Sequence, residues 1–110
     1  MSLKIKRTIK FSKSFKRLAK KYKSIAIDYV NLIDSLESGN HNAVEISNNI
    51  YKIRLQNSSN PKGKSGGFRV VYFFKTKANE IYLLDIFSKN ETNSIHKSKL
   101  QELSEKYGLI

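Results

Sequence analysis

The spacing of apolar residues predicts two helices in the first third of the chain. In residues 12–23 the apolar positions recur every three or four residues, which is typical of one face of an amphipathic helix. These positions are Phe15, Leu18, Ala19 and Tyr22. Ser12 is a suitable N-cap for this helix, and Ser24 for a second one over residues 24–38. Gly39 then ends the second helix, because glycine tolerates the left-handed conformation. The two helices are expected to form an antiparallel hairpin.

Four other segments have the patterns of strands. Residues 3–11 begin with alternating apolar and basic side chains, and residues 50–56 alternate as well, which indicates strands with one wet face. Residues 68–75 and 80–87 are apolar on both faces, as central strands are, and a turn at 77–79 joins them. Short connections predict that these last strands are antiparallel neighbours.

A final helix is predicted over residues 94–107, with Leu100, Leu103 and Tyr107 facing inward and Gly108 ending it. The predicted order is β-α-α-β-β-β-α, an α+β fold. We expect a twisted antiparallel sheet with the helix hairpin packed on it and a C-terminal helix. With 110 residues, the chain suits one domain over 1–110. The longest irregular stretch is 57–67, and long loops in small domains are often functional.

Composition excludes several classes of site. The chain has no cysteine, so disulfides and thiolate metal sites are excluded. His41 and His96 alone do not make a plausible zinc site, and His41 is interpreted as a loop residue. No apolar run approaches the roughly 18 residues needed to span a bilayer. The N-terminus lacks the apolar segment of a secretory signal. We therefore expect a cytoplasmic protein.

The net charge of +12 is concentrated at one end of the chain. Residues 1–23 contain ten Lys or Arg and no acidic residue. One interpretation is a solvated basic surface that keeps the protein soluble. A polyanionic partner, such as RNA, DNA or an acidic protein, explains the asymmetry better. Membrane-surface binding fits less well, because residues 12–23 lack a bulky apolar face. The basic residues of the first helix proposed to bind RNA are Lys13, Lys16, Arg17 and Lys20.

A second basic set lies around the stretch K-G-K-S-G-G-F-R-V-V-Y at residues 62–72. Its glycines allow positive φ angles and close approach to a ligand. Arg69 interrupts an otherwise apolar strand, where an isolated charge is expensive unless it is paired or kept for a ligand. Lys52 and Arg54 are two positions apart and share a strand face. We expect convergence on one patch of Lys52, Arg54, Arg69 and Lys89, with Lys62 and Lys64 at its rim.

Three segments together resemble the RelE/HigB toxins of bacterial type II toxin–antitoxin systems. They are Y-K-I-R-L at 51–55, the 62–72 stretch, and I-F-S-K-N-E at 86–91, and the G-G-F-R-V-V-Y piece is most similar to the HigB branch. The resemblance implies a ribosome-dependent endoribonuclease that cleaves mRNA without metal or cofactor. The ribose 2′-oxygen attacks the adjacent phosphorus, and a cognate antitoxin of helix-turn-helix type is expected to inhibit the toxin.

The resemblance also implies roles for individual residues. Lys52 and Arg54 match a strand lysine pair, with arginine at the second position, and Arg69 matches an arginine that contacts the scissile phosphate. Lys89 matches a basic residue after the last strand, whereas Asn90 stands where an arginine is found in RelE. That departure leaves the acid–base assignment open. His96 lies near a C-terminal tyrosine that stacks on RNA or assists proton transfer, but it is equally compatible with a surface position.

Two other functions remain open from the residues alone. ParE toxins share the fold and inhibit DNA gyrase, so the fold does not separate the two activities. A non-catalytic nucleic-acid-binding module is the third hypothesis. The basic set at 52, 54, 69 and 89 favours the ribonuclease, because a gyrase inhibitor does not need it.

Overall fold

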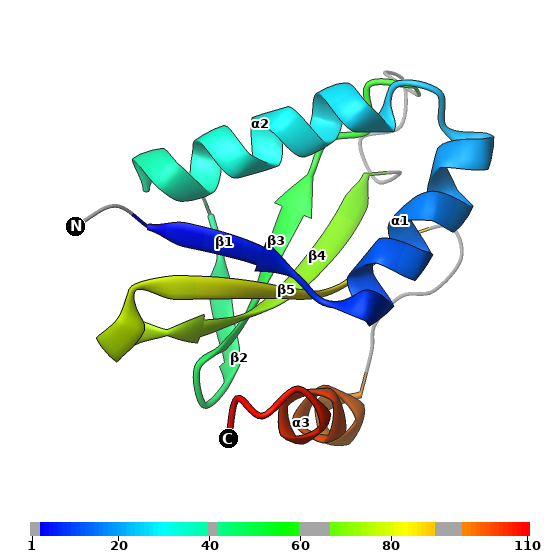
Figure 1. Ribbon diagram of the computed structural model, residues 1–110. Coiled ribbons are helices and arrows are strands. Elements are labelled where there is room, and N and C mark those ends of the chain that lie inside the picture. The colour runs from blue at the N-terminus through cyan, green and yellow to red at the C-terminus, as the bar shows by residue number, and fades with distance from the viewer. Residues whose placement is uncertain (1–2, 40–41, 60–66, 90–95) are drawn as a thin grey trace.

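A computed structural model describes residues 3–39, 42–59, 67–89 and 96–110 (Figure 1). The helices are α1 (Ile9–Lys21), α2 (Ile25–Ser38) and α3 (Lys97–Lys106), with a short 3-10 helix at Thr76–Ala78. The strands are β1 (Lys4–Arg7), β2 (Val44–Ser47), β3 (Ile50–Leu55), β4 (Phe68–Lys75) and β5 (Glu80–Ser88). None of these helices is long and apolar enough to cross a membrane.

The five strands form one sheet in the order β1-β5-β4-β3-β2. The predicted α+β class and the helix hairpin are confirmed, and β3, β4 and β5 are antiparallel neighbours. A wholly antiparallel sheet was the wrong prediction, because β1 runs parallel to β5. Short turns predict the relative direction of the last strands only. Most of the chain separates β1 from β5, so the connection between these two strands does not predict their relative direction. The strand β2 was not predicted and pairs with β3.

The first strand ends earlier than the alternation suggested. The prediction placed a strand over 3–11 and an N-cap at Ser12, but Thr8 caps α1 and its hydroxyl accepts a hydrogen bond from the Phe11 amide at 3.2 Å. The same hydroxyl donates to the Leu83 carbonyl at 2.7 Å. Thr8 therefore ends the strand, starts the helix and ties both to β5. The slip in the alternation after Arg7 marks this boundary.

The later helix boundaries agree better with the sequence. Gly39 ends α2 in the left-handed conformation with φ of 74°, as predicted. Ser24 occupies the N-cap position of α2, although its side chain makes no capping hydrogen bond. Helix α3 begins at Lys97, three residues later than position 94. Gly108 follows it with φ of 72°.

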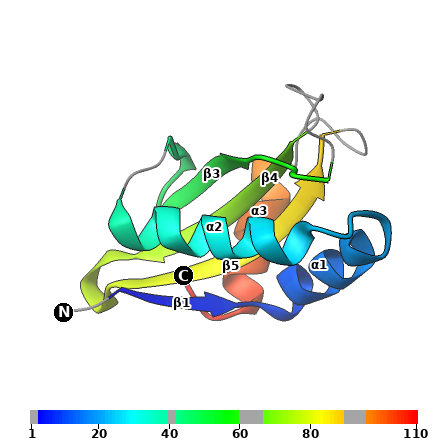
Figure 2. The same cartoon turned by 90° about the horizontal axis from the view of Figure 1, so that it is seen from above.

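Helices α1 and α2 cover one face of the sheet (Figures 1 and 2). Their apolar stripe packs on side chains that alternate along β4, namely Phe68, Val70 and Tyr72. Buried residues of the two helices in this cluster are Phe11, Leu18, Ile25, Leu32 and Leu36, and Tyr22 at the C-cap of α1 joins them. This is the larger core, and burial of its apolar surface is the main stabilising contribution to the fold.

Helix α3 lies on the opposite face and covers only part of it (Figure 2). Leu100 and Leu109 pack in a second cluster with Val71, Phe73 and Leu84 of the central strands. Because β-strand side chains alternate between faces, Arg69 points to the same side as Val71 and Phe73. The fold therefore leaves one end of this face without a covering helix, and Arg69 lies there.

A buried polar network joins α1 to the sheet and to the end of the chain. Asp85 accepts a hydrogen bond from the Ser14 hydroxyl at 2.5 Å, and its other oxygen lies 3.5 Å from the Lys10 ammonium. The Lys10 amide donates to the Tyr107 hydroxyl at 2.9 Å. The first turns of α1 are therefore tied to both β5 and the C-terminal residues.

Truncation of a core residue in α1 tests the packing of the hairpin on the sheet. Leu18 is 1% exposed, so Leu18→Ala is expected to lower the free energy of unfolding by about 2–5 kcal/mol in urea denaturation. The matched control is Ile27→Ala on the outer side of α2, where the side chain is 61% exposed. This variant should change stability by less than about 0.5 kcal/mol. Equal effects of the two substitutions would contradict the packing described here.

Candidate functional site

The strand register brings three of the predicted basic residues onto one face. Arg54 of β3 lies directly opposite Arg69 of β4, and Lys52 lies opposite Val71. Directly opposed residues of an antiparallel pair have their Cβ atoms about 4.5–5.5 Å apart, and like charges in this arrangement are destabilising. The sheet therefore holds two guanidinium groups together against their mutual repulsion.

These residues line a groove of about 430 Å³ at the uncovered end of the sheet face. The described residues that line it are Asn42, Val44, Lys52, Arg54, Arg69 and Lys89. The predicted convergence of positions 52, 54, 69 and 89 is thus seen in the structure. Among these lining residues four are cationic and none is acidic. The groove is suited to an anionic ligand.

Arg69 is the most buried of the four cations. Its side chain is 9% exposed, and its Nη1 donates to the Phe68 carbonyl at 3.3 Å. Burial lowers the pKa of Arg69 below its ordinary value, and the neighbouring charge of Arg54 lowers it further. Arginine nevertheless stays protonated in proteins. Arg69 is therefore a fixed, partly desolvated positive charge, which interacts more strongly with an anion than a solvated lysine does.

No carboxylate neutralises the groove within the described ranges. The ion pairs found in the described ranges join Lys6 to Glu80 and Lys10 to Asp85. Neither pair involves a residue that lines the groove. An uncompensated charge near the protein interior is unfavourable. Such groups often mark functional sites, where a ligand supplies the missing partner.

Gly67 permits the close approach of β3 and β4 beside the groove. A Cβ atom at this position would lie 2.7 Å from the Leu55 carbonyl oxygen and 3.7 Å from Arg69 Nη1. The backbone φ of Gly67 is not positive, so the left-handed conformation that glycine allows is not used here. Its role is to leave space next to Arg69. Gly63 and Gly66 lie outside the described residues.

Lys89 reaches the groove from the end of β5. Its backbone amide donates to the Gly67 carbonyl at 3.2 Å, which joins the end of β5 to the start of β4. The side chain is half-buried at the groove wall. Lys62, Lys64 and Asn90, which were expected near this rim, lie outside the described residues, as does His41.

His96 is at the N-cap position of α3, where its side chain is exposed and makes no capping hydrogen bond. It is not one of the described residues that line the groove. Within the described ranges, no group of three or more histidine or acidic side chains is placed to hold a metal ion.

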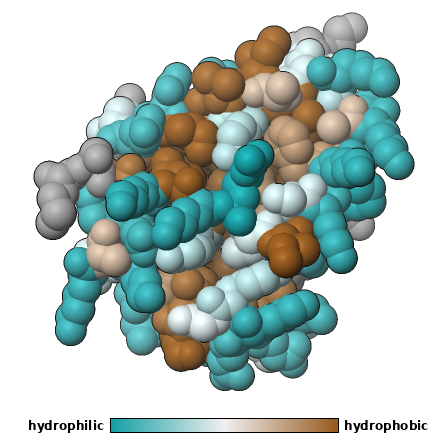
Figure 3. Space-filling view, viewed as in Figure 1, coloured by the Kyte–Doolittle hydropathy of each residue, from teal (hydrophilic) through white to brown (hydrophobic). Residues whose placement is uncertain are grey.

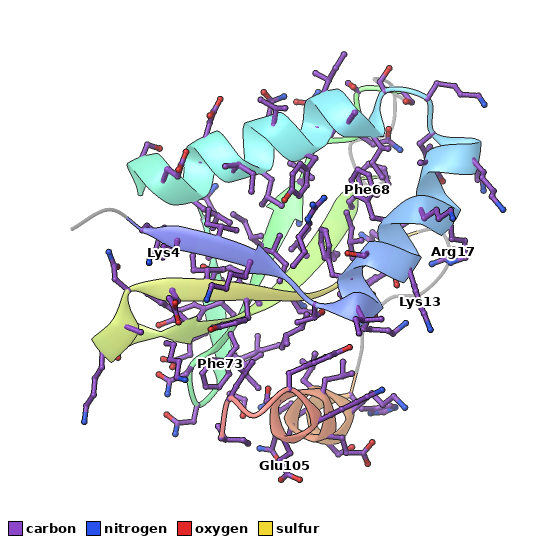
Figure 4. The ribbon with its side chains drawn as sticks, in the orientation of Figure 1. Lys4, Lys13, Arg17, Phe68, Phe73 and Glu105 are labelled. Carbon is purple, nitrogen blue, oxygen red and sulfur yellow. The ribbon has the colours of Figure 1, made fainter. Side chains whose placement is uncertain are left out.

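The predicted RNA-binding residues of α1 form a separate basic surface. Lys13, Lys16, Arg17 and Lys20 are exposed. Lys13 and Arg17 project from α1 away from the sheet (Figure 4), and none of the four lines the groove. Hydrophilic side chains dominate the α1 side of the molecule, whereas hydrophobic ones reach the surface over α2 (Figure 3). The structure therefore keeps the two basic sets on separate surfaces.

Two groove residues were missed from the sequence. Asn42 and Val44 belong to a segment interpreted as a polar turn and its continuation, but Val44 begins β2 and lies opposite Lys52. Val44 is 60% exposed, so the groove has an apolar wall beside its cations. The signal was the alternation in V-E-I-S at 44–47. This alternation is easy to overlook because it extends over four residues only.

Comparison with known proteins agrees with this fold. Residues 6–108 match the family model described as the RelE toxin of the RelE/RelB toxin–antitoxin system. The chain therefore belongs to the RelE toxin family. It is also similar to the structure of E. coli toxin RelE, determined as a double arginine-to-alanine mutant in the free state. The TM-score is 0.57 at 18% identity, with 84% of this chain and 90% of that chain covered.

Replacement of Arg69 by a neutral side chain of similar length tests whether the groove is held against electrostatic repulsion. Arg69→Met removes a buried cation and its repulsion with Arg54, so it should raise the free energy of unfolding by about 1 kcal/mol. Lys75→Met at the exposed end of β4 is the control and should give no such gain. The difference should shrink as salt is added to the urea denaturation. A destabilised Arg69→Met protein would show that the guanidinium supports the fold.

Proposed function

We propose that this chain is the ribosome-dependent endoribonuclease toxin of a type II toxin–antitoxin system, from the HigB branch of the family. The observation that carries the proposal is the groove with four cations, no acidic lining residue and a buried arginine at its base. A scissile phosphate is the anion that such a toxin must bind. The family membership supports a toxin with an antitoxin partner. Because mRNA is the proposed substrate and the ribosome is the proposed site of cleavage, we propose that the toxin acts in the cytoplasm.

Arg54 and Arg69 are proposed to bind the scissile phosphate. Their opposed positions place two guanidinium groups beside one site, and each can donate paired hydrogen bonds to phosphoryl oxygens. Negative charge gathers on these oxygens when the ribose 2′-oxygen attacks phosphorus. Fixed cations in a partly desolvated groove stabilise this charge without reorganising during the reaction. A bound phosphate would also relieve the repulsion between the two arginines.

Proton transfer requires a base for the 2′-hydroxyl and an acid for the leaving 5′-oxygen. Lys52 of β3 and Lys89, just after β5, line the groove from the two sides of β4, so both are proposed catalytic residues. His96 is proposed as the third, on the family resemblance, because imidazole titrates near neutral pH. These three residues, with Arg54 and Arg69, make up the proposed catalytic set.

The basic surface of α1 is proposed to bind ribosomal RNA, while Lys62 and Lys64 are proposed to bind RNA at the groove rim. Lys13 and Arg17 project away from the sheet, and Lys16 and Lys20 are exposed, so this surface is able to contact a separate phosphate backbone while the groove holds mRNA. Association through lysine and arginine contacts is electrostatic and depends on salt.

The nuclease assignment is tested by substitution at the base of the groove. Arg69→Ala should abolish growth arrest on induced expression and remove the mRNA cleavage sites seen by primer extension, because it removes the buried cation. Lys75→Ala, on the same strand but outside the groove, should remain fully toxic. Folding of both variants is checked by circular dichroism.

A different result would identify another activity. A folded Arg69→Ala protein that still cleaves mRNA would remove this residue from the site. Intact transcripts with halted DNA replication in the wild type would favour gyrase inhibition instead. RNA binding without cleavage would favour the non-catalytic module.

The role of the α1 surface is tested by salt dependence. Ribosome association of the wild type should fall steeply as salt rises. Simultaneous replacement of Lys13, Lys16, Arg17 and Lys20 by alanine should weaken it and reduce the salt slope by roughly 0.7–0.9 per lost phosphate contact. Lys97→Ala on α3 is the control, with a nearly unchanged slope. Association that is insensitive to salt would contradict the electrostatic role.

A further inference from the structure

A second cavity opens on the other face of the sheet. It has a volume of about 630 Å³ and lies beneath the C-terminal end of α2. Tyr51, Tyr72 and Phe74 contribute aromatic side chains to its lining, and Leu3 and Leu36 contribute aliphatic ones. None of its described lining residues belongs to the cationic groove. The two sites are therefore separate, and a ligand here needs a different chemistry.

The aromatic side chains offer π faces and phenol groups. Tyr51 and Tyr72 are stacked with ring centroids 5.4 Å apart and an interplanar angle of 11°, and Phe74 lies 6.5 Å from Tyr51. Tyr72 is 2% exposed and forms part of the cavity lining. Burial raises the pKa of Tyr72 to about 12, so the phenol is neutral at physiological pH. Aromatic faces attract cations, so this lining favours a positively charged ligand group.

The rim of the cavity is negative. Glu37, Ser38 and Gly39 at the end of α2 contribute to it, and Glu37 is exposed. The last turn of α2 has no basic residue, so no cationic side chain of the helix compensates the negative end of its dipole. Residues 24–51 contain four acidic residues and no Lys or Arg, in a chain of net charge +12.

We propose that this cavity binds an arginine or lysine side chain presented by a peptide segment of a partner protein. The aliphatic stem packs on Tyr51 and Tyr72, and the cationic head lies at the rim between Glu37 and the α2 carbonyl groups. The volume is within the roughly 300–1,000 Å³ of ligand pockets, so it also has room for side chains that flank the cation. A phosphate is disfavoured because Glu37 and the helix end repel it.

Titration of the full-length chain with capped tripeptides tests this proposal, and NMR signals of the tyrosine rings report binding. The Arg69→Ala background is used so that the protein can be produced whether or not the nuclease assignment holds. Acetyl-Leu-Arg-Leu-amide should give saturable shifts of Tyr51 and Tyr72. The same peptide with norleucine at the centre keeps the stem without the charge and should bind several-fold more weakly. A third peptide with glutamate at the centre should also bind more weakly than the arginine peptide.

Matched variants separate the cavity from general charge attraction. Glu37→Gln should lower the affinity for the arginine peptide by about two- to fivefold, which is the range expected for loss of an exposed ion pair. Asp34→Asn, one turn earlier on α2 and outside the cavity lining, should leave its binding unchanged. The proposal is overturned if no peptide shifts these signals, if norleucine binds equally well, or if both variants weaken binding alike. Shifts produced by adenosine monophosphate instead would indicate a nucleotide site.

Discussion

Two arginines lie directly opposite each other on adjacent strands, and the packing of the sheet on its helices keeps them in this position. The repulsion between Arg54 and Arg69 opposes strand pairing, but the alternate side chains of the same strands are buried against α1 and α2. A shift of one residue in the β3–β4 register would expose that core, so the register is strongly specified. The energy of the large apolar cluster thereby fixes the positions of two cations on the other face.

The incomplete cover of that second face gives the charges access to solvent and ligands. Helix α3 packs over Val71, Phe73 and Leu84 but leaves the Arg69 end open. Gly67 leaves space beside Arg69, and the hydrogen bond from the Lys89 amide to the Gly67 carbonyl holds the end of β5 next to it. The face of the sheet that packs on α1 and α2 thus carries the large apolar cluster that stabilises the fold. The other divides into an apolar half under a helix and a cationic half.

Much of this arrangement follows from sequence patterns. The spacing of two between Lys52 and Arg54, and the single charge in the apolar strand at Arg69, predicted a shared patch that the structure contains. Other features depend on long-range pairing that no local pattern encodes, such as the parallel direction of β1. An irregularity in the pairing of β4 with β5 allows Leu84 and Phe87, three positions apart, to join the same cluster, which strict alternation forbids. The groove wall at Asn42 and Val44 required a strand too short to be recognised from its alternation.

The hydrogen bond from the Lys10 amide to the Tyr107 hydroxyl has a mechanical consequence. Lys10 also lies near buried Asp85, whose partner Ser14 is one turn further along α1. A partner that lifts the C-terminal helix off the sheet must therefore break a contact with the start of α1 as well as expose the apolar cluster beneath. Release of the last helix would therefore also remove a hydrogen bond from the first turn of α1, the helix that carries the basic surface.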